Sequence, residues 1–300
     1  MHAGTYVENI SILGKSISLV GENRQTTIID GNASDVVLTI SNVSDTLATI
    51  RGLTITNGTG GMGEGGGLKI INSNPQILET NIINNLNNDF GRGAGVWIVD
   101  NSNPRFFDVE IRGNTSDESG AGIGCYNSNF TLQNVIISNN TIIGNGDGGG
   151  IYAWNCDLET NEVVISNNYA QRGAGIYFER GFVNIQSSTI INNTDMNDDG
   201  GGIYMHEDAQ IQIISSILWD NSPSAIYLNE SGNSILINHS NIHGGESGIG
   251  INSSNQEISF GSNNIDSNPL FCNQSGGDFT LAENSPCLLY TSDAADEEDS

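Results

Sequence analysis

Short apolar runs separated by Gly, Asn and Ser recur along most of the chain at a nearly constant spacing. An aliphatic residue that follows a glycine, or Ala225 in one unit, recurs every 23 to 28 residues, at Leu68, Val96, Ile123, Ile151, Ile176, Ile203, Ile226 and Ile249. A second marker, an Asn after an aliphatic run, recurs in step with it at Asn57, Asn85, Asn114, Asn140, Asn168, Asn193 and Asn221. Two markers that repeat together indicate one structural unit per period.

Each unit contains too much Gly and Asn, and apolar runs too short, for a helix. In one unit the runs 176–178, 182–185 and 189–191 have the length and alternation of short strands. Three such strands cannot enclose a core alone, but stacked units can. The repeat therefore predicts an all-β fold, a single-stranded right-handed parallel β-helix. This solenoid would have about ten coils, with like strands about 4.8 Å apart. We expect the Asn residues to stack inside a bend and the Gly pairs to allow a tight corner.

Charge narrows the possible partners. The chain of 300 residues has 35 acidic residues against 9 Lys and Arg, which gives a formal net charge of −26. Nucleic acid is therefore not expected as a partner, because phosphates require a basic face. The acidity could simply keep a repetitive surface soluble, or it could bind Ca²⁺ at acidic turns. We expect a monomer without a transmembrane segment, and the first residues lack the charged and apolar regions of a secretory signal.

Three segments near the start carry a family resemblance. Residues 4–10 (GTYVENI), 17–21 (ISLVG) and 27–31 (TIIDG) resemble the opening coils of pectin-lyase-like β-helix proteins, pectin methylesterases among them. The repeats over residues 50–250 resemble those of secreted right-handed β-helix proteins and of chlamydial polymorphic outer-membrane proteins. The resemblance implies a location outside a bacterium or on its surface. It is specific for the fold and says little about activity.

Changes in composition divide the chain into four segments. We expect N-terminal coils at 1–49, preceded in the native chain by a cap, and regular repeats at 50–250. Residues 251–286 resemble the terminal segment of bacterial secreted β-helix proteins. Residues 287–300 form an acidic tail that resembles the translation of a transposase adapter used in sequencing-library preparation, and we interpret it as non-native.

Four cysteines give one candidate disulfide. Cys272 and Cys287 would close a loop of about 15 residues, worth roughly 3 kcal/mol if bridged, although Cys287 adjoins the suspected tail. Cys125 and Cys156 occupy different positions of the repeat, so we expect two small buried residues instead of a pair. No spacing typical of a zinc site occurs.

Strand alternation places a set of aromatic residues on one side of the sheet. If Ile176 and Phe178 point inward, Tyr177 and Glu179 point outward, and the same phase applies to every coil. An exposed aromatic strip could stack on sugar rings, or it could only stabilise the sheet. The candidate glycan-binding residues are Trp97, Tyr126, Tyr152, Trp154, Tyr177, Tyr204 and Tyr227.

Candidate chemistry is sparse. Glu179 and His206 should be neighbours on adjacent coils, where they could support general acid–base catalysis or form an ordinary surface pair. Asp195, Asp198 and Asp199 precede three glycines and could hold Ca²⁺, the one cofactor we consider. The catalytic motifs of polygalacturonases, pectate lyases and pectin methylesterases are not recognisable.

Three functions therefore remain open. The leading hypothesis is a non-catalytic, exported or surface-attached protein that binds a polysaccharide or cell-surface glycan, or serves as an adhesin or stalk. The second is a polysaccharide lyase or hydrolase acting near Glu179 and His206. The third is a structural repeat module of a larger surface protein.

Overall fold

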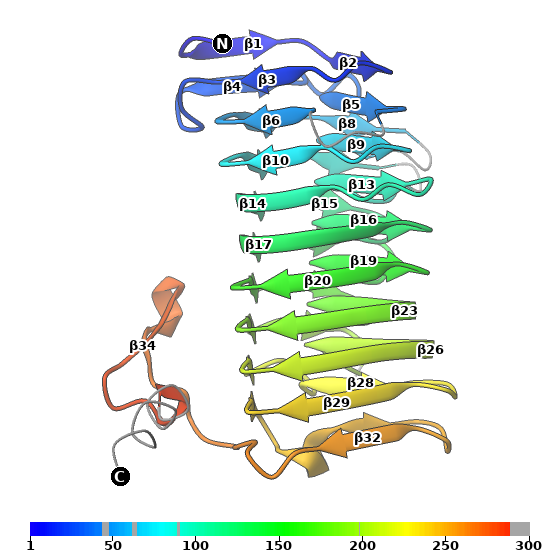
Figure 1. Cartoon of the computed structure of the whole chain (residues 1–300), viewed down its shortest axis with the longest axis vertical. Helices are drawn as coiled ribbons and strands as arrows, with labels where there is room; N and C mark the ends of the chain where they lie inside the picture. The colour runs from blue at the N-terminus through cyan, green and yellow to red at the C-terminus, as the bar shows by residue number, and fades with distance from the viewer. Residues whose placement is uncertain (44–47, 62–64, 89–90, 198, 289–300) are drawn as a thin grey trace, which may run out of the picture.

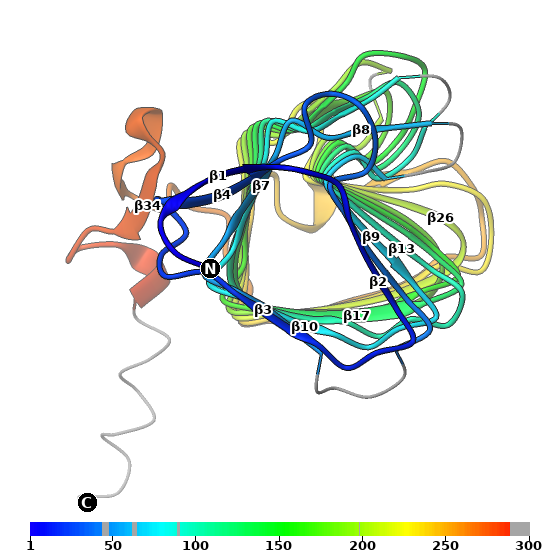
Figure 2. The same ribbon diagram turned by 90° about the horizontal axis from the view of Figure 1, so that it is seen from above.

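The computed structural model describes residues 1–43, 48–61, 65–88, 91–197 and 199–288. Its strands stack into a rod, with the N-terminal coils at one end (Figure 1). Viewed along the axis, three sheets enclose the core, and a bundle of loops projects from one corner (Figure 2). The coil-to-coil pairings are all parallel, and the predicted parallel β-helix is confirmed.

The first sheet contains the strands that follow the glycines, and we call it the aromatic sheet. Its consecutive pairings place Leu68 beside Val96, Ile151 beside Ile176, and Ile203 beside Ile226, so the aliphatic marker of the repeat is in register. Its strands are β2 (Ile10–Leu13), β5 (Leu38–Ser41), β9 (Leu68–Ile71), β13 (Val96–Val99), β16 (Ile123–Tyr126), β19 (Ile151–Trp154), the first parts of β23 (Ile176–Gln186) and β26 (Ile203–Ile214), β28 (Ile226–Leu228) and β31 (Gly250–Ile251).

The second and third sheets close the core. The long strands β23 and β26 turn a corner from the aromatic sheet into the second sheet (Figure 1). The long strands β14 (Arg105–Arg112) and β17 (Asn129–Ser138) turn a corner from the second sheet into the third. The second sheet comprises β3 (Ser18–Val20), β6 (Thr49–Arg51), β10 (Gln76–Leu78), the first parts of β14 (Arg105–Arg112) and β17 (Asn129–Ser138), β20 (Asp157–Asn161), the second parts of β23 and β26, β29 (Ser234–Asn238) and β32 (Glu257–Phe260). The third comprises β1 (Gly4–Val7), β4 (Thr27–Asp30), β7 (Thr54–Thr56), β11 (Asn81–Ile83), the second parts of β14 and β17, β21 (Val164–Ser166), β24 (Thr189–Ile191), β27 (Ile217–Trp219) and β30 (Asn241–Ile242).

Over the residues that the structure describes, a fourth, short strand occurs in six of the coils, beyond the three strands predicted. These strands lie in the projecting loops, which we call the arms, and they form a sheet of their own. They are β8 (Thr59–Gly60), β12 (Leu86–Asn87), β15 (Thr115–Ser116), β18 (Thr141–Ile142), β22 (Tyr169–Ala170) and β25 (Thr194–Asp195). Because the arms pair with one another, each returns to the aromatic sheet at nearly the same place.

A buried column of Asn side chains stabilises the bend where each arm begins. Asn168 Nδ2 donates to Asn193 Oδ1 at 3.0 Å and to the Ile137 carbonyl at 3.0 Å. The same stacking runs without interruption through Asn85, Asn114, Asn140, Asn168, Asn193 and Asn221. The predicted Asn column is confirmed from Asn85 onward, but Asn57 is not a member. Strand pairing places Gly58 beside Asn85, and Asn57 is exposed, with a positive φ of 56°.

The C-terminal segment leaves the rod and folds back along its side (Figure 1). Coil stacking continues beyond residue 250 to a bridge between Asn241 and Ile265. An antiparallel hairpin of β33 (Phe271–Asn273) and β34 (Asp278–Leu281) follows. Gln274, at the hairpin's turn, donates to Asp220 Oδ2 at 2.8 Å, which ties the segment to the third sheet.

Candidate functional site

The outward positions of the aromatic sheet form two adjacent columns, as the alternation predicted. Strand pairing places Trp97, Gly124, Tyr152, Tyr177, Tyr204 and Tyr227 in the first, which we call the inner column. It places Val99, Tyr126, Trp154, Glu179 and His206 in the second, the outer column. Register alone therefore brings Glu179 and His206 together, and this predicted adjacency is confirmed.

The expectation of an exposed strip is wrong for much of the inner column. Trp97 is 6% exposed, Tyr177 4% and Tyr204 2%. The ends of the arms lie against these side chains: a Cβ at Gly93, where φ is 66°, would come within 2.9 Å of Trp97 Cβ, and the Arg172 guanidinium lies over the rings of Tyr177 and Tyr204. Sequence alternation gave the direction of the side chains correctly, but it could not show that the arms fold over them.

The inner rings stack on one another along the axis. The ring centroids of Tyr152 and Tyr177 are 5.2 Å apart, those of Tyr177 and Tyr204 5.3 Å, and those of Tyr204 and Tyr227 5.5 Å. Glycines leave room for two of these rings. Trp97 packs on Gly124 and Tyr227 on Gly250, and a Cβ at either glycine would collide with the ring. The ring faces therefore contact neighbouring coils, as expected of a ladder that stabilises the sheet.

A salt bridge from the arms covers the middle of this ladder. Arg172 donates to Asp147 through Nε at 2.9 Å and Nη2 at 2.7 Å, and its guanidinium carbon lies 5.5 Å from the ring centroids of both Tyr177 and Tyr204. Burial raises the pKa of the Asp147 carboxyl although Arg172 opposes the shift. Burial also raises the pKa of Tyr152 and of Tyr204 to about 12.

The outer column is partly exposed and carries polar chemistry. Tyr126 and Trp154 stack with their centroids 4.3 Å apart and their planes at 9°. Trp154 Nε1 donates to Glu179 Oε1 at 2.9 Å, and the Tyr177 hydroxyl donates to Glu179 Oε2 at 3.4 Å. Two ring donors from two coils thus fix the carboxylate of Glu179.

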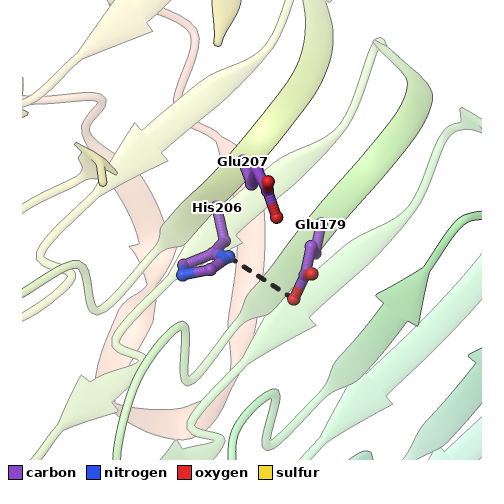
Figure 3. A group of neighbouring side chains, drawn as sticks. All are labelled: Glu179, His206 and Glu207. Carbon is purple, nitrogen blue, oxygen red and sulfur yellow. Dashed lines mark ion pairs between the residues drawn. The ribbon is translucent and has the colours of Figure 1, made fainter. Parts of the chain in front are cut away.

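Glu179, His206 and Glu207 converge beside this stack (Figure 3). His206 Nδ1 lies 3.4 Å from Glu179 Oε2, with side-chain exposures of 23% and 14%. Arg180 forms an ion pair with Glu207, lies 3.8 Å from Glu179 Oε1, and places its guanidinium 5.6 Å from the Trp154 ring centroid. The cluster therefore combines two carboxylates, an imidazole and a guanidinium on one rigid sheet edge.

Glu207 reaches the cluster because the strand contains one extra residue. In β16, β19 and β23 the outer-column residue is followed directly by a left-handed residue at the corner, namely Asn127, Asn155 and Arg180. In β26 the left-handed residue is Asp208, and the pairing between β23 and β26 shifts there by one position. Glu207 is thus the inserted residue of a β-bulge, a feature that commonly re-aims a side chain. Arg180, Glu207, Asp147 and Arg172 were not among the predicted site residues; the longer corner of β26 was the one signal available for Glu207.

The Asp195 carboxylate, one of the predicted calcium ligands, accepts hydrogen bonds from the backbone. Asp195 accepts from the Asn197 amide at 2.6 Å and from the Gly173 amide at 3.2 Å, and burial raises its pKa to about 6. Asp199 interacts with the Tyr227 hydroxyl. Asp198 lies outside the described residues, so Ca²⁺ binding at this loop stays a prediction. Over the described part of the chain, the one group of three or more side chains with metal-ligand atoms within 4.8 Å is Glu179, His206 and Glu207.

The cysteine predictions are corrected. Cys125 and Cys156 form a disulfide with a Cα–Cα distance of 6.6 Å. Both side chains point inward on adjacent coils, and the corner after β19 brings Cys156 within reach of Cys125 although their repeat positions differ. The expected pair Cys272 and Cys287 is not formed, and both are free. Cys272 is exposed in the hairpin, whereas Cys287 Sγ contacts Asn241 Nδ2 at 3.1 Å.

Comparisons with known proteins identify the family and nothing more specific. The described residues contain no helix that is long and apolar enough to cross a membrane. No curated protein and no solved structure matches the chain. The family of the right-handed beta helix region matches residues 4–162, more than half of the sequence. The coils, the Asn column and this match agree, and the chain belongs to the right-handed β-helix family.

Proposed function

We propose that this protein is an exported or cell-surface glycan-binding β-helix and that the outer column is its contact surface. The observation that carries the proposal is the fixed arrangement of Trp154 against Glu179, with His206 and Arg180 beside them. Partly exposed aromatic rings beside preoriented donors and acceptors are suited to sugar hydroxyl groups.

The mode of contact differs from face-on stacking. Tyr126 covers one face of Trp154, and the Arg180 guanidinium lies near the Trp154 ring as well. A saccharide would therefore meet ring edges and polar groups. The net charge of −26 disfavours polyanionic glycans, so a neutral polysaccharide lying along the coil axis is the preferred ligand class.

The disulfide supports a location outside the cytoplasm. Cys125 and Cys156 are both buried, at 0% and 2% exposure. Disulfides persist mainly in exported proteins, because the cytosol keeps thiols reduced.

Polysaccharide cleavage is a second candidate, favoured by the neighbouring Glu179 and His206. An imidazole 3.4 Å from a carboxylate, with Glu207 nearby, could act as a general acid–base set. The cleavage hypothesis requires that the protein release product and that this release depend on His206. The binding proposal requires no product release.

Affinity electrophoresis through gels containing neutral or acidic polysaccharides tests the proposal. We expect the wild type to be retarded by at least one neutral glycan and Trp154→Ala to lose that retardation. Trp219→Ala is the matched control, since Trp219 also stacks on a partner ring, His243, at 4.2 Å but on the third sheet. Unchanged retardation of Trp154→Ala, or no retardation of the wild type on any glycan, would contradict the proposal. Release of reducing or unsaturated ends that His206→Ala abolishes would establish the second candidate.

A further inference from the structure

The three converging side chains are chemically a ligand set for a metal ion. Glu179, His206 and Glu207 each direct one ligand atom to a common region, with all three atoms within 4.8 Å of one another (Figure 3). An imidazole nitrogen with two carboxylates is a donor set that Zn²⁺ and similar divalent ions use in proteins.

The imidazole nitrogen that faces this region has no hydrogen bond. His206 Nδ1 is buried and has no hydrogen-bond partner, and its ion-pair contact with Glu179 Oε2 is 3.4 Å long. Charge-assisted hydrogen bonds are shorter, at about 2.7–2.9 Å. Two ligands each about 2.0–2.1 Å from a tetrahedral Zn²⁺ lie roughly 3.3 Å apart. The separation of His206 Nδ1 and Glu179 Oε2 is therefore compatible with two ligands that share one ion.

We infer that Glu179, His206 and Glu207 form a binding site for one divalent transition-metal ion, with Zn²⁺ as the reference ion. Water would complete the coordination. The site does not depend on glycan binding, because all three ligands come from the protein.

The surroundings of the ligands support this assignment. The Glu179 carboxylate receives hydrogen bonds from Trp154 Nε1 at 2.9 Å and from the Tyr177 hydroxyl at 3.4 Å. Such partners fix the orientation of metal-binding carboxylates. Glu207 owes its position to the bulge in β26, so the third ligand arises from an insertion in an otherwise regular repeat.

Arg180 now occupies the position of a cation in this cluster. It pairs with Glu207 and lies 3.8 Å from Glu179, while 40% of its side chain is exposed. Metal binding requires this guanidinium to move into solvent. Arg180 therefore competes with the ion, which gives the proposal a test of opposite sign: removal of Arg180 should strengthen metal binding.

Isothermal titration of the full chain with ZnCl₂, and visible absorption with CoCl₂, measure the site. His2→Ala serves as the background, because His2 and Glu22 form another His–carboxylate pair, 2.6 Å apart at the exposed N-terminus. We expect one equivalent of ion in this background. His206→Ala and Glu207→Gln should each weaken binding at least about tenfold, since even outer-shell partners are worth 10- to 100-fold.

Two variants distinguish a metal site from loss of structure. Arg180→Asn should tighten binding, and Asn is tolerated there because Asn127 and Asn155 occupy the equivalent left-handed corners. His243→Ala should leave binding unchanged, although His243 also lies 3.5 Å from a carboxylate, that of Asp220. The proposal is overturned if the background binds no ion, if His206→Ala binds as the background does, or if Arg180→Asn weakens binding while its circular dichroism is unchanged.

Discussion

Arg172 and Asp147 form a bidentate salt bridge between neighbouring arms, with donor–acceptor distances of 2.9 and 2.7 Å. The bridge lies over the rings of Tyr177 and Tyr204, and 11% of the Asp147 side chain is exposed. It therefore joins the arms to the ladder beneath them and helps to bury the inner column.

Replacement of Arg172 should destabilise the protein, because it leaves the buried Asp147 carboxylate without its ion-pair partner. We expect Arg172→Met to lower the free energy of unfolding by about 2 kcal/mol, because Asp147 would stay buried without its partner. This expected loss of stability is smaller than that for fully buried ion pairs, since 34% of the Arg172 side chain is exposed. Urea denaturation measures the loss. The double variant Asp147→Asn, Arg172→Met should regain part of the lost stability. A double variant less stable than Arg172→Met would contradict this account.

The Asn column should be far more sensitive than the Asn residues beside it. In Asn168→Ala the buried amides of Asn140 and the neighbouring carbonyls lose their partners, which should cost about 2–4 kcal/mol. Asn167→Ala is the matched control: Asn167 is exposed with a φ of 55°, so only about 1 kcal/mol of strain is expected. Denaturant midpoints of the two variants compare them, and equal losses would refute a structural role for the column.

Thiol counting tests the corrected disulfide. Without reductant, denatured protein should show two reactive thiols, from Cys272 and Cys287, and four after reduction. Cys125 and Cys156 are 31 residues apart, so the bridge should contribute about 3–4 kcal/mol by the loop-entropy model. Cys125→Ala combined with Cys156→Ala should show that loss in urea. Four reactive thiols in the unreduced protein would disprove the pairing.

Asp195 should make stability fall as the pH rises. Its pKa is raised to about 6 in the folded state, above the ordinary 3.8, so the folded state holds the proton more tightly. Ionisation between pH 4 and 6 therefore costs about 2–3 kcal/mol. Asp195→Asn removes this contribution, so its stability relative to wild type should increase across that interval. A difference that does not vary between pH 4 and 7 would refute the assignment.

The tyrosine ladder should delay ionisation at high pH. Burial raises the pKa of Tyr152 and of Tyr204 to about 12, so these hydroxyls stay neutral when exposed tyrosines have ionised. Their raised folded-state pKa means that stability is lost as the pH rises from 10 towards 12. Absorbance at the tyrosinate band should show an early and a late phase. Tyr204→Phe should reduce the late phase, and a late phase of unchanged amplitude in this variant would contradict the assignment.

The sequence by itself determined the coil. The spacing of the aliphatic marker specified which strands pair, and alternation specified that Tyr177 and Glu179 point away from the core. Because a parallel β-helix stacks like positions on like positions, this one-dimensional pattern was also sufficient to place His206 beside Glu179.

Only the tertiary structure decided what lies around those positions. The arms bury Tyr177 and Tyr204, a corner joins Cys125 to Cys156, and a one-residue bulge brings Glu207 to His206. These features depend on how loops fold back and on where a single insertion is accommodated. Neither is contained in a repeat period, because the period fixes only the contacts between equivalent positions of successive coils.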